Sequence, residues 1–169
     1  MKQTYTSANT SVNRTKVPAI FKKTLGKLGP VNLDLGGGKY DTATEFLRAK
    51  GVENFIIDPY NRSPEENETN ESLIILYGGA DSCTISNVLN VIDTRPARLD
   101  TLKYARLMLR SGGSLFITVY EGHPDREPCR TGKDQWQNNW PIHCYLGEVK
   151  TVFPNAYIEG KMIIATKEA

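Results

Sequence analysis

The sequence predicts a single α/β domain in which helices cover a mostly parallel sheet. Three features point to this fold class. Short apolar runs alternate with helix-like stretches along most of the chain, a glycine-rich turn follows the first apolar run, and two apolar runs close the chain as a hairpin. The 169 residues suffice for one domain with a substantial core but not for two ordinary ones. We therefore expect a polar N-terminal segment, 1–16, and one domain, 17–169.

The first half of the chain contains start and stop signals for each expected element. Apolar residues recur at helical spacing ahead of the first apolar run. Thr42-Ala-Thr-Glu45 matches a capping box, and Gly51 is a natural helix stop. The expected elements up to residue 90 are, in order, a helix in 17–28, a strand at 31–35, a helix at 42–50, a strand at 55–57, a helix opening at 63–66, and a strand with its exit turn in 81–90.

The second half continues the alternation of helices and strands. Asp93 or Thr94 can cap a helix that the stretch 111–113, with its two glycines, terminates. A regular apolar face begins just after Pro141. The remaining expected elements are, in order, a helix ending at 109, a strand at 115–120, an irregular polar stretch at 121–140, a helix at 141–153, and a hairpin of 157–158 and 162–166.

The segment 31–58 reads as a strand, glycine turn, helix and strand, which is typical of nucleoside-binding units. Its glycine triplet allows close backbone approach to a ligand, and Asp58 sits where a carboxylate can bind a ribose diol. A dinucleotide fingerprint would place glycine at position 41, so that a pyrophosphate could lie on the helix N-terminus. Asp41 would instead repel a diphosphate, so a loop that carries Asp34 and Asp41 suits a cationic ligand.

S-adenosylmethionine (SAM) fits these constraints, because it carries a sulfonium, an ammonium and a ribose diol but no phosphate. The chain contains no G-K-[ST] sequence, which excludes a phosphate-binding P-loop. Two alternatives stay open: a strand–turn–helix unit without a ligand, and a nicotinamide site.

These residues resemble the first motif of class I SAM-dependent methyltransferases, acid-x-Gly-x-Gly, which is matched by Asp34, Gly36 and Gly38. The resemblance covers about residues 31–166. It implies a single-domain, Rossmann-like three-layer sandwich that ends in an antiparallel hairpin. It also implies SAM as cofactor, with Asp34 near the ammonium, the two glycines against the ligand through their backbone, and Asp58 on the ribose.

The resemblance implies two further cofactor contacts, and this chain departs from the family at one strand. Residues that flank the family's fourth strand contact adenine or face the methyl group, which here implies Asp81 and Asn87. Asp81 can equally be an acid in a solvated turn after a helix. The family usually has a third strand at the sheet edge, for which only 73–76 remains here, and those residues can equally end the preceding helix. We expect the third strand to be absent or vestigial.

The candidate catalytic residues are Asn87, Tyr120 and Gln137. They lie at or beyond the carboxyl ends of strands, where open α/β sheets bind ligands. Methyl transfer depends mainly on placement, so no catalytic triad is expected. The stretch 132–140, with two tryptophans among amides, can stack on and hydrogen-bond a planar acceptor, or it can fold back and pack on the sheet.

Two sequence features bear on the acceptor. Amino-methylating enzymes of the family carry two prolines and an aromatic residue after the Asp or Asn, whereas Val88 and Leu89 follow Asn87 here. Residues 86–98 resemble small methyltransferase-like proteins of phages and mobile elements, among them one associated with DNA phosphorothioation. This similarity suggests a DNA-modification context without assigning a substrate.

Composition excludes several classes of protein. A net charge of +2 permits a nucleic-acid partner but does not require one. No apolar run is long enough to span a bilayer, so no membrane association is expected. Cys83, Cys129 and Cys144 are odd in number and lack paired spacing, which favours a reduced, cytoplasmic protein. The cysteines, His123 and His143 lack zinc-site spacing, so no metal is expected.

The sequence therefore predicts an enzyme that transfers a methyl group from SAM to an unidentified acceptor, with DNA or a nucleotide among the candidates. The alternative is a SAM-binding protein without transferase activity, acting as a sensor or accessory subunit. A nicotinamide-dependent oxidoreductase is a weaker third reading. The segment 1–16 is either a lid that orders over the site or a frayed tail.

Overall fold

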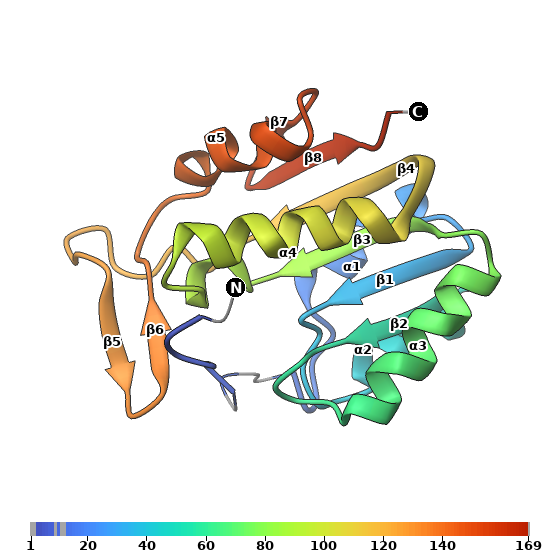
Figure 1. Cartoon of the computed structure of the whole chain (residues 1–169), viewed down its shortest axis with the longest axis horizontal. Coiled ribbons are helices and arrows are strands. Elements are labelled where there is room, and N and C mark those ends of the chain that lie inside the picture. Colours follow the sequence, from blue (N-terminus) through green and yellow to red (C-terminus); the bar gives the residue numbers. More distant parts are fainter. Residues whose placement is uncertain (1–2, 9, 11–12, 169) are drawn as a thin grey trace.

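The computed structural model describes residues 3–8, 10 and 13–168, and in these residues a six-stranded sheet forms the centre of the molecule (Figure 1). Its strand order is β2-β1-β3-β4-β8-β7. The strands are β1 (Val31–Leu35), β2 (Glu53–Ile57), β3 (Ala80–Ser86), β4 (Leu109–Thr118), β7 (Tyr157–Glu159) and β8 (Met162–Thr166). The first four pair in parallel, while β8 pairs antiparallel with β4 and β7. The predicted mostly parallel sheet with a C-terminal hairpin is confirmed.

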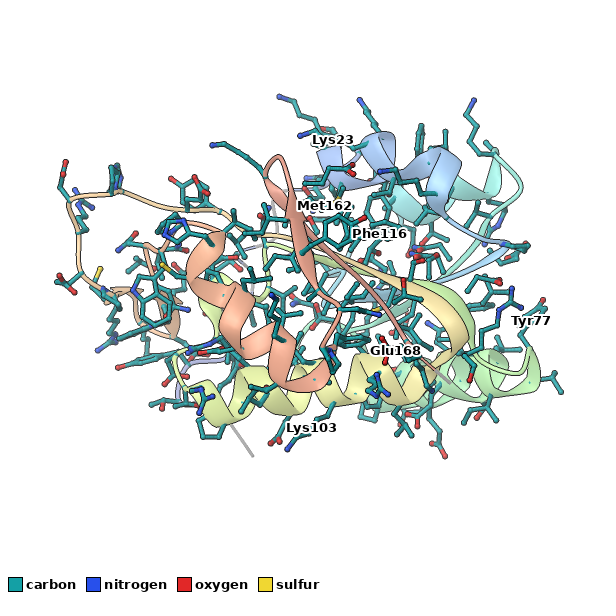
Figure 2. All side chains as sticks on the ribbon, turned by 90° about the horizontal axis from the view of Figure 1, so that it is seen from above. Lys23, Tyr77, Lys103, Phe116, Met162 and Glu168 are labelled. Carbon is teal, nitrogen blue, oxygen red and sulfur yellow. The ribbon has the colours of Figure 1, made fainter. Side chains whose placement is uncertain are left out.

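Helices cover both faces of this sheet, which gives the predicted three layers (Figure 2). They are α1 (Ala19–Thr24), α2 (Thr42–Arg48), α3 (Pro64–Leu76), α4 (Arg95–Met108) and α5 (His143–Val152). On one face, α1 and α2 share a core cluster that joins Phe21 to Phe116. On the other face, the remaining helices form a larger cluster that includes Ile74, Leu102 and Val149.

The helix α3 begins and ends so as to leave no room for a further strand. The Ser63 hydroxyl accepts from Glu66 N (3.1 Å), and the Glu66 carboxylate accepts from Ser63 N (3.0 Å), which is a complete capping box. The helix then runs to Leu76 and takes residues 73–76 into its last turns. Within the described residues no strand lies between β2 and β3, so the third strand is absent, as predicted, and β2 is the edge of the sheet.

Two asparagines of α3 cover part of that edge. Asn70 Nδ2 donates to the backbone oxygen of Ile56 (2.8 Å). Asn67 Oδ1 accepts from the backbone nitrogen of Asp58 (2.8 Å), and Asn67 Nδ2 donates to its backbone oxygen (3.0 Å). Outward-facing backbone groups that another strand would have paired thus find partners in side chains.

Two expectations about the helix and strand starts are wrong. Thr42 does not cap α2, because it is already the first helical residue; Asp41 holds the N-cap position, and Thr42 Oγ1 donates to Arg14 O instead (3.0 Å). Strand β4 begins at Leu109, directly after α4, rather than at 115. Its register against β3 shifts at this point, and Gly112, with a φ of 79°, lies within the irregular stretch.

The stretch 121–140, expected to be irregular, contains a separate antiparallel hairpin of β5 (Cys129–Gly132) and β6 (Gln135–Gln137). These strands are short and show no apolar alternation, so the sequence carries no strand signal there. Figure 1 shows this hairpin beside the N-terminal residues, at the end of the sheet where β3 finishes. Among the described residues, no helix combines the length and apolarity that crossing a bilayer requires.

Candidate functional site

A cavity of about 460 Å³ lies at the carboxyl ends of β1, β2 and β3. This volume is within the range of small-molecule binding sites, and the position is the one at which open α/β sheets bind ligands. The lining comprises residues 34–38, 57–61 and 86–88 at the strand ends, Val91 and Ile92, Asn67 of α3, Thr101 and Tyr104 of α4, Pro18 and Phe21, and five residues of the N-terminal segment.

The turn after β1 brings its backbone close to the other walls of the cavity. Gly36 and Gly38 have φ angles of 75° and 78°, in the left-handed region that favours glycine. A Cβ atom at Gly36 would lie 2.5 Å from Val88 Cγ2, and one at Gly37 would lie 2.4 Å from Asp34 Oδ2. Larger residues are therefore excluded from this turn by both conformation and space, and its backbone forms part of the cavity wall.

Asp34 is the most unusual group in the cavity wall. It is 2% exposed, and its buried Oδ1 atom has no hydrogen-bond partner. Burial raises the pKa of this carboxyl to about 7, with a further contribution from the nearby Asp58 carboxylate, and the Asn54 side chain and the charge of Arg62 offset only part of the effect. A buried carboxyl with an unpartnered oxygen at a cavity is a ready site for a cationic group.

Asp58 also lines the cavity, but protein donors already occupy its carboxylate. Gly38 N donates to Oδ2 (2.9 Å), Tyr60 N and Asn61 N donate to Oδ1 (both 3.0 Å), and the Asn61 side-chain amide donates to both oxygens. These bonds connect the turn after β1 to the loop after β2. A ribose diol at this carboxylate would have to take the place of the Asn61 amide.

Asn87 lies at the rim of the cavity, immediately after β3. It has a φ of 57°, a left-handed conformation that asparagine adopts more readily than most residues, and its backbone nitrogen donates to Thr118 O (2.9 Å). Its side chain is exposed, and no hydrogen bond to its amide is found among the described residues. Of the three predicted catalytic residues, Asn87 is the one that the structure brings to the cavity.

The prediction that Asp81 binds the cofactor does not fit its position. Asp81 lies at the amino end of β3, whereas the cavity lies beyond the carboxyl end at Ser86. Five residues of extended strand separate two such positions by roughly 16 Å. The Asp81 carboxylate instead accepts from Val31 N (2.8 Å) and pairs with Arg110, so it holds the start of β1 beside β3.

Gln137 and Tyr120 lie outside the cavity lining. Gln137 is 7% exposed, donates to the Tyr120 backbone oxygen (2.9 Å) and accepts from Asn90 Nδ2 (3.0 Å). The next amide, Asn138, donates to the Leu89 backbone oxygen (3.0 Å) and accepts from Trp136 Nε1 (2.7 Å). These amides attach the β5–β6 hairpin to the turn after β3. Of the two possibilities for 132–140, binding a planar acceptor or folding back to pack, the structure shows packing.

The N-terminal residues 3–8, here called the strap, lie along this hairpin and reach the cavity. The Tyr5 ring stacks on Trp136, with centroids 5.5 Å apart and an interplanar angle of 12°. Ser7, 4% exposed, donates to Val91 O (3.2 Å) and accepts from Trp136 N (3.2 Å). Thr6 donates to the Asp134 carboxylate through both its nitrogen and its hydroxyl. Side chains of the strap thereby become part of the cavity wall.

Several lining residues carry no recognisable sequence signal. Thr101 and Tyr104 occupy the face of α4 that a helical pattern assigns to packing, and the Tyr104 hydroxyl donates to Glu71 of α3 (3.0 Å). Asp41, used to argue against a diphosphate, lies outside the lining and pairs with Arg62 (2.8 Å). Its charge is therefore partly neutralised, and Asp34 is the acid in the cavity wall that suits a cationic ligand. No cluster of metal-ligating side chains is found among the described residues.

No protein-family profile matches this sequence, and no curated protein matches it. The fold, in contrast, is similar to several solved structures. A Burkholderia thailandensis 1,6-didemethyltoxoflavin-N1-methyltransferase, solved with 1,6-didemethyltoxoflavin and S-adenosylhomocysteine, has a TM-score of 0.61 and 15% identity over 89% of this chain and 76% of that one.

Two further structures are similar over most of this chain. PigF, solved with S-adenosylhomocysteine, has a TM-score of 0.59 and 15% identity and covers 88% of this chain. The S-adenosylmethionine-dependent methyltransferase SibL, in its apo form, has a TM-score of 0.57 and 14% identity and covers 89%. This chain spans 54% of the length of each. At such identities the likeness is one of fold, the Rossmann-like sandwich described above.

The Asp34 carboxyl should make folding stability depend on pH. Its folded-state pKa is about 7 against a usual value of 3.8, so between these values the folded protein holds a proton that the unfolded chain has released. This contribution to stability is fully present below the unfolded value and is lost as pH rises toward 7, by up to about 1.4 kcal/mol per pH unit. Asp34→Asn cannot titrate and should lack this fall.

The measurement is the free energy of unfolding in urea for both proteins across about pH 4 to 8. The difference between them should shift progressively in favour of the variant as pH rises, since all other titrating groups are shared. A difference that stays constant over this range would mean that Asp34 is ionised in the folded protein throughout.

Proposed function

We propose that this chain is a class I methyltransferase that transfers a methyl group from S-adenosylmethionine to an acceptor. The observation that carries the proposal is Asp34, a buried carboxyl with an unpartnered oxygen, set behind a glycine turn at the carboxyl edge of a parallel sheet. SAM offers an ammonium to such a group and brings no phosphate that would need a cationic partner. The solved structures of similar fold that contain S-adenosylhomocysteine support the same ligand.

The lining residues fit the parts of this cofactor. Asp34 would bind the ammonium, and the backbone of Gly36 and Gly38 would lie against the ligand. Asp58 would take the ribose diol, with Asn61 moving aside. The Tyr60 and Tyr104 rings, which also line the cavity, are suited to the flat adenine.

When bound, SAM supplies an electrophilic methyl group on its sulfonium, and the chain supplies placement. Asp34 fixes one end of the cofactor by charge, and the glycine turn fixes its position along the sheet edge. Val88 and Val91 keep water from the wall beside β3. Asn87, whose side-chain amide faces solvent at the rim, can accept a hydrogen bond from an acceptor and hold it in line with the methyl group.

The acceptor belongs to the same proposal, with DNA or a nucleotide as the first candidates. They are motivated by the resemblance of residues 86–98 to methyltransferase-like proteins of phages and mobile elements. A cytoplasmic setting is also part of it, because all three cysteines, Cys83, Cys129 and Cys144, are unbridged.

A ligand screen by thermal shift tests the cofactor. SAM and S-adenosylhomocysteine should raise the melting temperature, whereas NAD should not. At a ligand concentration a hundredfold above Kd the stabilisation is about 2.7 kcal/mol. Asp34→Asn should lose most of the shift, while Glu45→Gln, exposed on α2, should keep it. A shift with NAD alone would reject the proposal.

A second candidate is a SAM-binding protein without transferase activity, a sensor or accessory subunit. It is favoured by the positions of Tyr120 and Gln137, which lie off the cavity and leave Asn87 as the remaining catalytic candidate. The two candidates share the cofactor site and differ in whether an acceptor is modified.

Methyl transfer from radiolabelled SAM to pooled DNA, RNA and metabolites separates the two candidates. An enzyme should label one pool, and Asn87→Gly should lower that labelling about ten- to a hundredfold, as expected for one lost hydrogen bond of 1–3 kcal/mol. Glycine is chosen because it keeps the left-handed backbone. SAM affinity of the variant should stay within about twofold. Saturable SAM binding with no labelled pool would favour the sensor.

We also propose that the strap acts as a lid over the cofactor. It lines the cavity, yet it is held mainly by exposed hydrogen bonds, among them Thr4 N to Asp93 (3.1 Å) and Thr6 N to Asp134 (3.0 Å). Such contacts can open without disturbing the core. Ligand exchange would then require the strap to leave the hairpin.

Asp134→Ala removes both bonds to Thr6 and should raise the dissociation rate of SAM about tenfold, the effect of losing about 1.4 kcal/mol. Stopped-flow fluorescence can follow it, since Trp136 stacks on the strap. Asp125→Ala, exposed in the loop between β4 and β5, is the control. If dissociation is unchanged while the melting temperature falls, the strap is an anchor rather than a lid.

A further inference from the structure

Charge is unevenly distributed along this chain. Residues 1–33 contain no acidic residue and six basic ones: Lys2, Arg14, Lys16, Lys22, Lys23 and Lys27. In contrast, α3 carries four glutamates and no basic residue. The near-balanced net charge therefore conceals a basic side around α1 and an acidic side at α3.

The cations on the α1 side mostly lack acidic partners. Arg14, Lys16, Lys22 and Lys23 are all exposed, and no carboxylate of the described residues lies within ion-pair distance of them. Lys27, which follows these residues in the chain, does have an acidic partner and pairs with Glu159 (2.7 Å). Figure 2 shows Lys23 projecting from α1 away from the sheet, with Phe116 and Met162 beneath the helix. Clustered like charges oppose folding, so this arrangement has no structural benefit of its own.

This row of cations leads to the cavity. Asn13, Pro18 and Phe21 come from the same segment and line the cavity, so the backbone that carries Arg14 and Lys16 runs between residues of the cavity wall. The Arg14 backbone is tied to the start of α2 by Thr42 (3.0 Å). From the cavity, α1 carries Lys22 and Lys23 toward the amino ends of the strands, because the chain enters β1 there. The cations are therefore carried by a stretch of chain that runs from the cavity toward the amino ends of the strands.

From this arrangement we propose that the row Arg14, Lys16, Lys22 and Lys23, here called the basic row, binds the phosphate backbone of a nucleic acid and so brings it to the cavity mouth. A row suits a chain of phosphates, whereas a single phosphate would need converging donors. This inference rests on the proposed function only for the identity of the cavity as a SAM site. Nucleic-acid binding by the basic row does not depend on it.

An anionic membrane is the other partner that cations of this kind attract. Peripheral membrane binding through a helix needs apolar side chains that enter the lipid. The exposed large apolar residues of the described chain are Tyr60, Ile75, Leu76, Tyr77, Leu107, Tyr120 and Tyr157. None of them belongs to the segment 13–30, so the basic row lacks a lipid anchor.

Fluorescence anisotropy with labelled 20-nucleotide single strands and duplexes, at about 50 to 200 mM salt, tests the proposal. Binding should weaken with salt, with a log–log slope of about −0.7 for each single-strand phosphate contact. The double variant Lys22→Gln/Lys23→Gln should bind several-fold more weakly and reduce that slope by about 1.4. Its thermal shift with SAM should equal that of the wild type, because neither lysine lines the cavity.

The matched control is Lys103→Gln/Lys150→Gln, which removes two exposed lysines from α4 and α5 on the other face. It should keep both affinity and slope. Three results would overturn the proposal: no binding by the wild type at the lowest salt, equal losses in the two double variants, or binding to phosphatidylserine vesicles in place of nucleic acid. Nucleic-acid binding without any response to SAM would instead retain the basic row and reject the cofactor.

Discussion

The carboxylate of Asp58 holds the cavity together. Four protein donors converge on it, one from the glycine turn after β1 and three from the loop after β2. Asn67 of α3 binds the backbone on both sides of the same residue. The glycine turn has a left-handed backbone and would be poorly held on its own, so its shape depends on these charge-assisted bonds. Two adjacent loops and one helix therefore behave as a single wall, against which Asp34 can stay buried.

The parts of the structure that sequence could predict are those set by local patterns. The glycine turn at 34–38 and the helix that opens at 63–66 each depend on a few neighbouring residues, and both are found as expected. The absence of a third strand also followed from counting, since too few residues remained between Asp58 and β3. In the same way Gly51, with a φ of 78°, ends α2 where a glycine stop was expected.

Apart from the Thr42 cap, the parts that failed depend on where distant segments meet. The partners of Gln137 and Asn138 are Asn90 and Leu89, whose approach no local pattern encodes, so packing amides looked like a binding surface. The strap reaches the cavity through the same hairpin. Asp81 is a different case, because strand direction alone decides its position. In a parallel sheet, a residue that precedes a strand lies at the opposite edge from one that follows it, and that rule was sufficient to exclude it.

The asparagines that cover β2 have a consequence for how this protein behaves at high concentration. An open strand edge is a template on which strands of other molecules can add, and it is a common origin of aggregation. Here Asn67 and Asn70 occupy backbone groups that an incoming strand would need, and Glu65 and Glu66 of α3 add negative charge beside β2. Side chains from a neighbouring helix thus protect the β2 edge of the sheet without an additional strand.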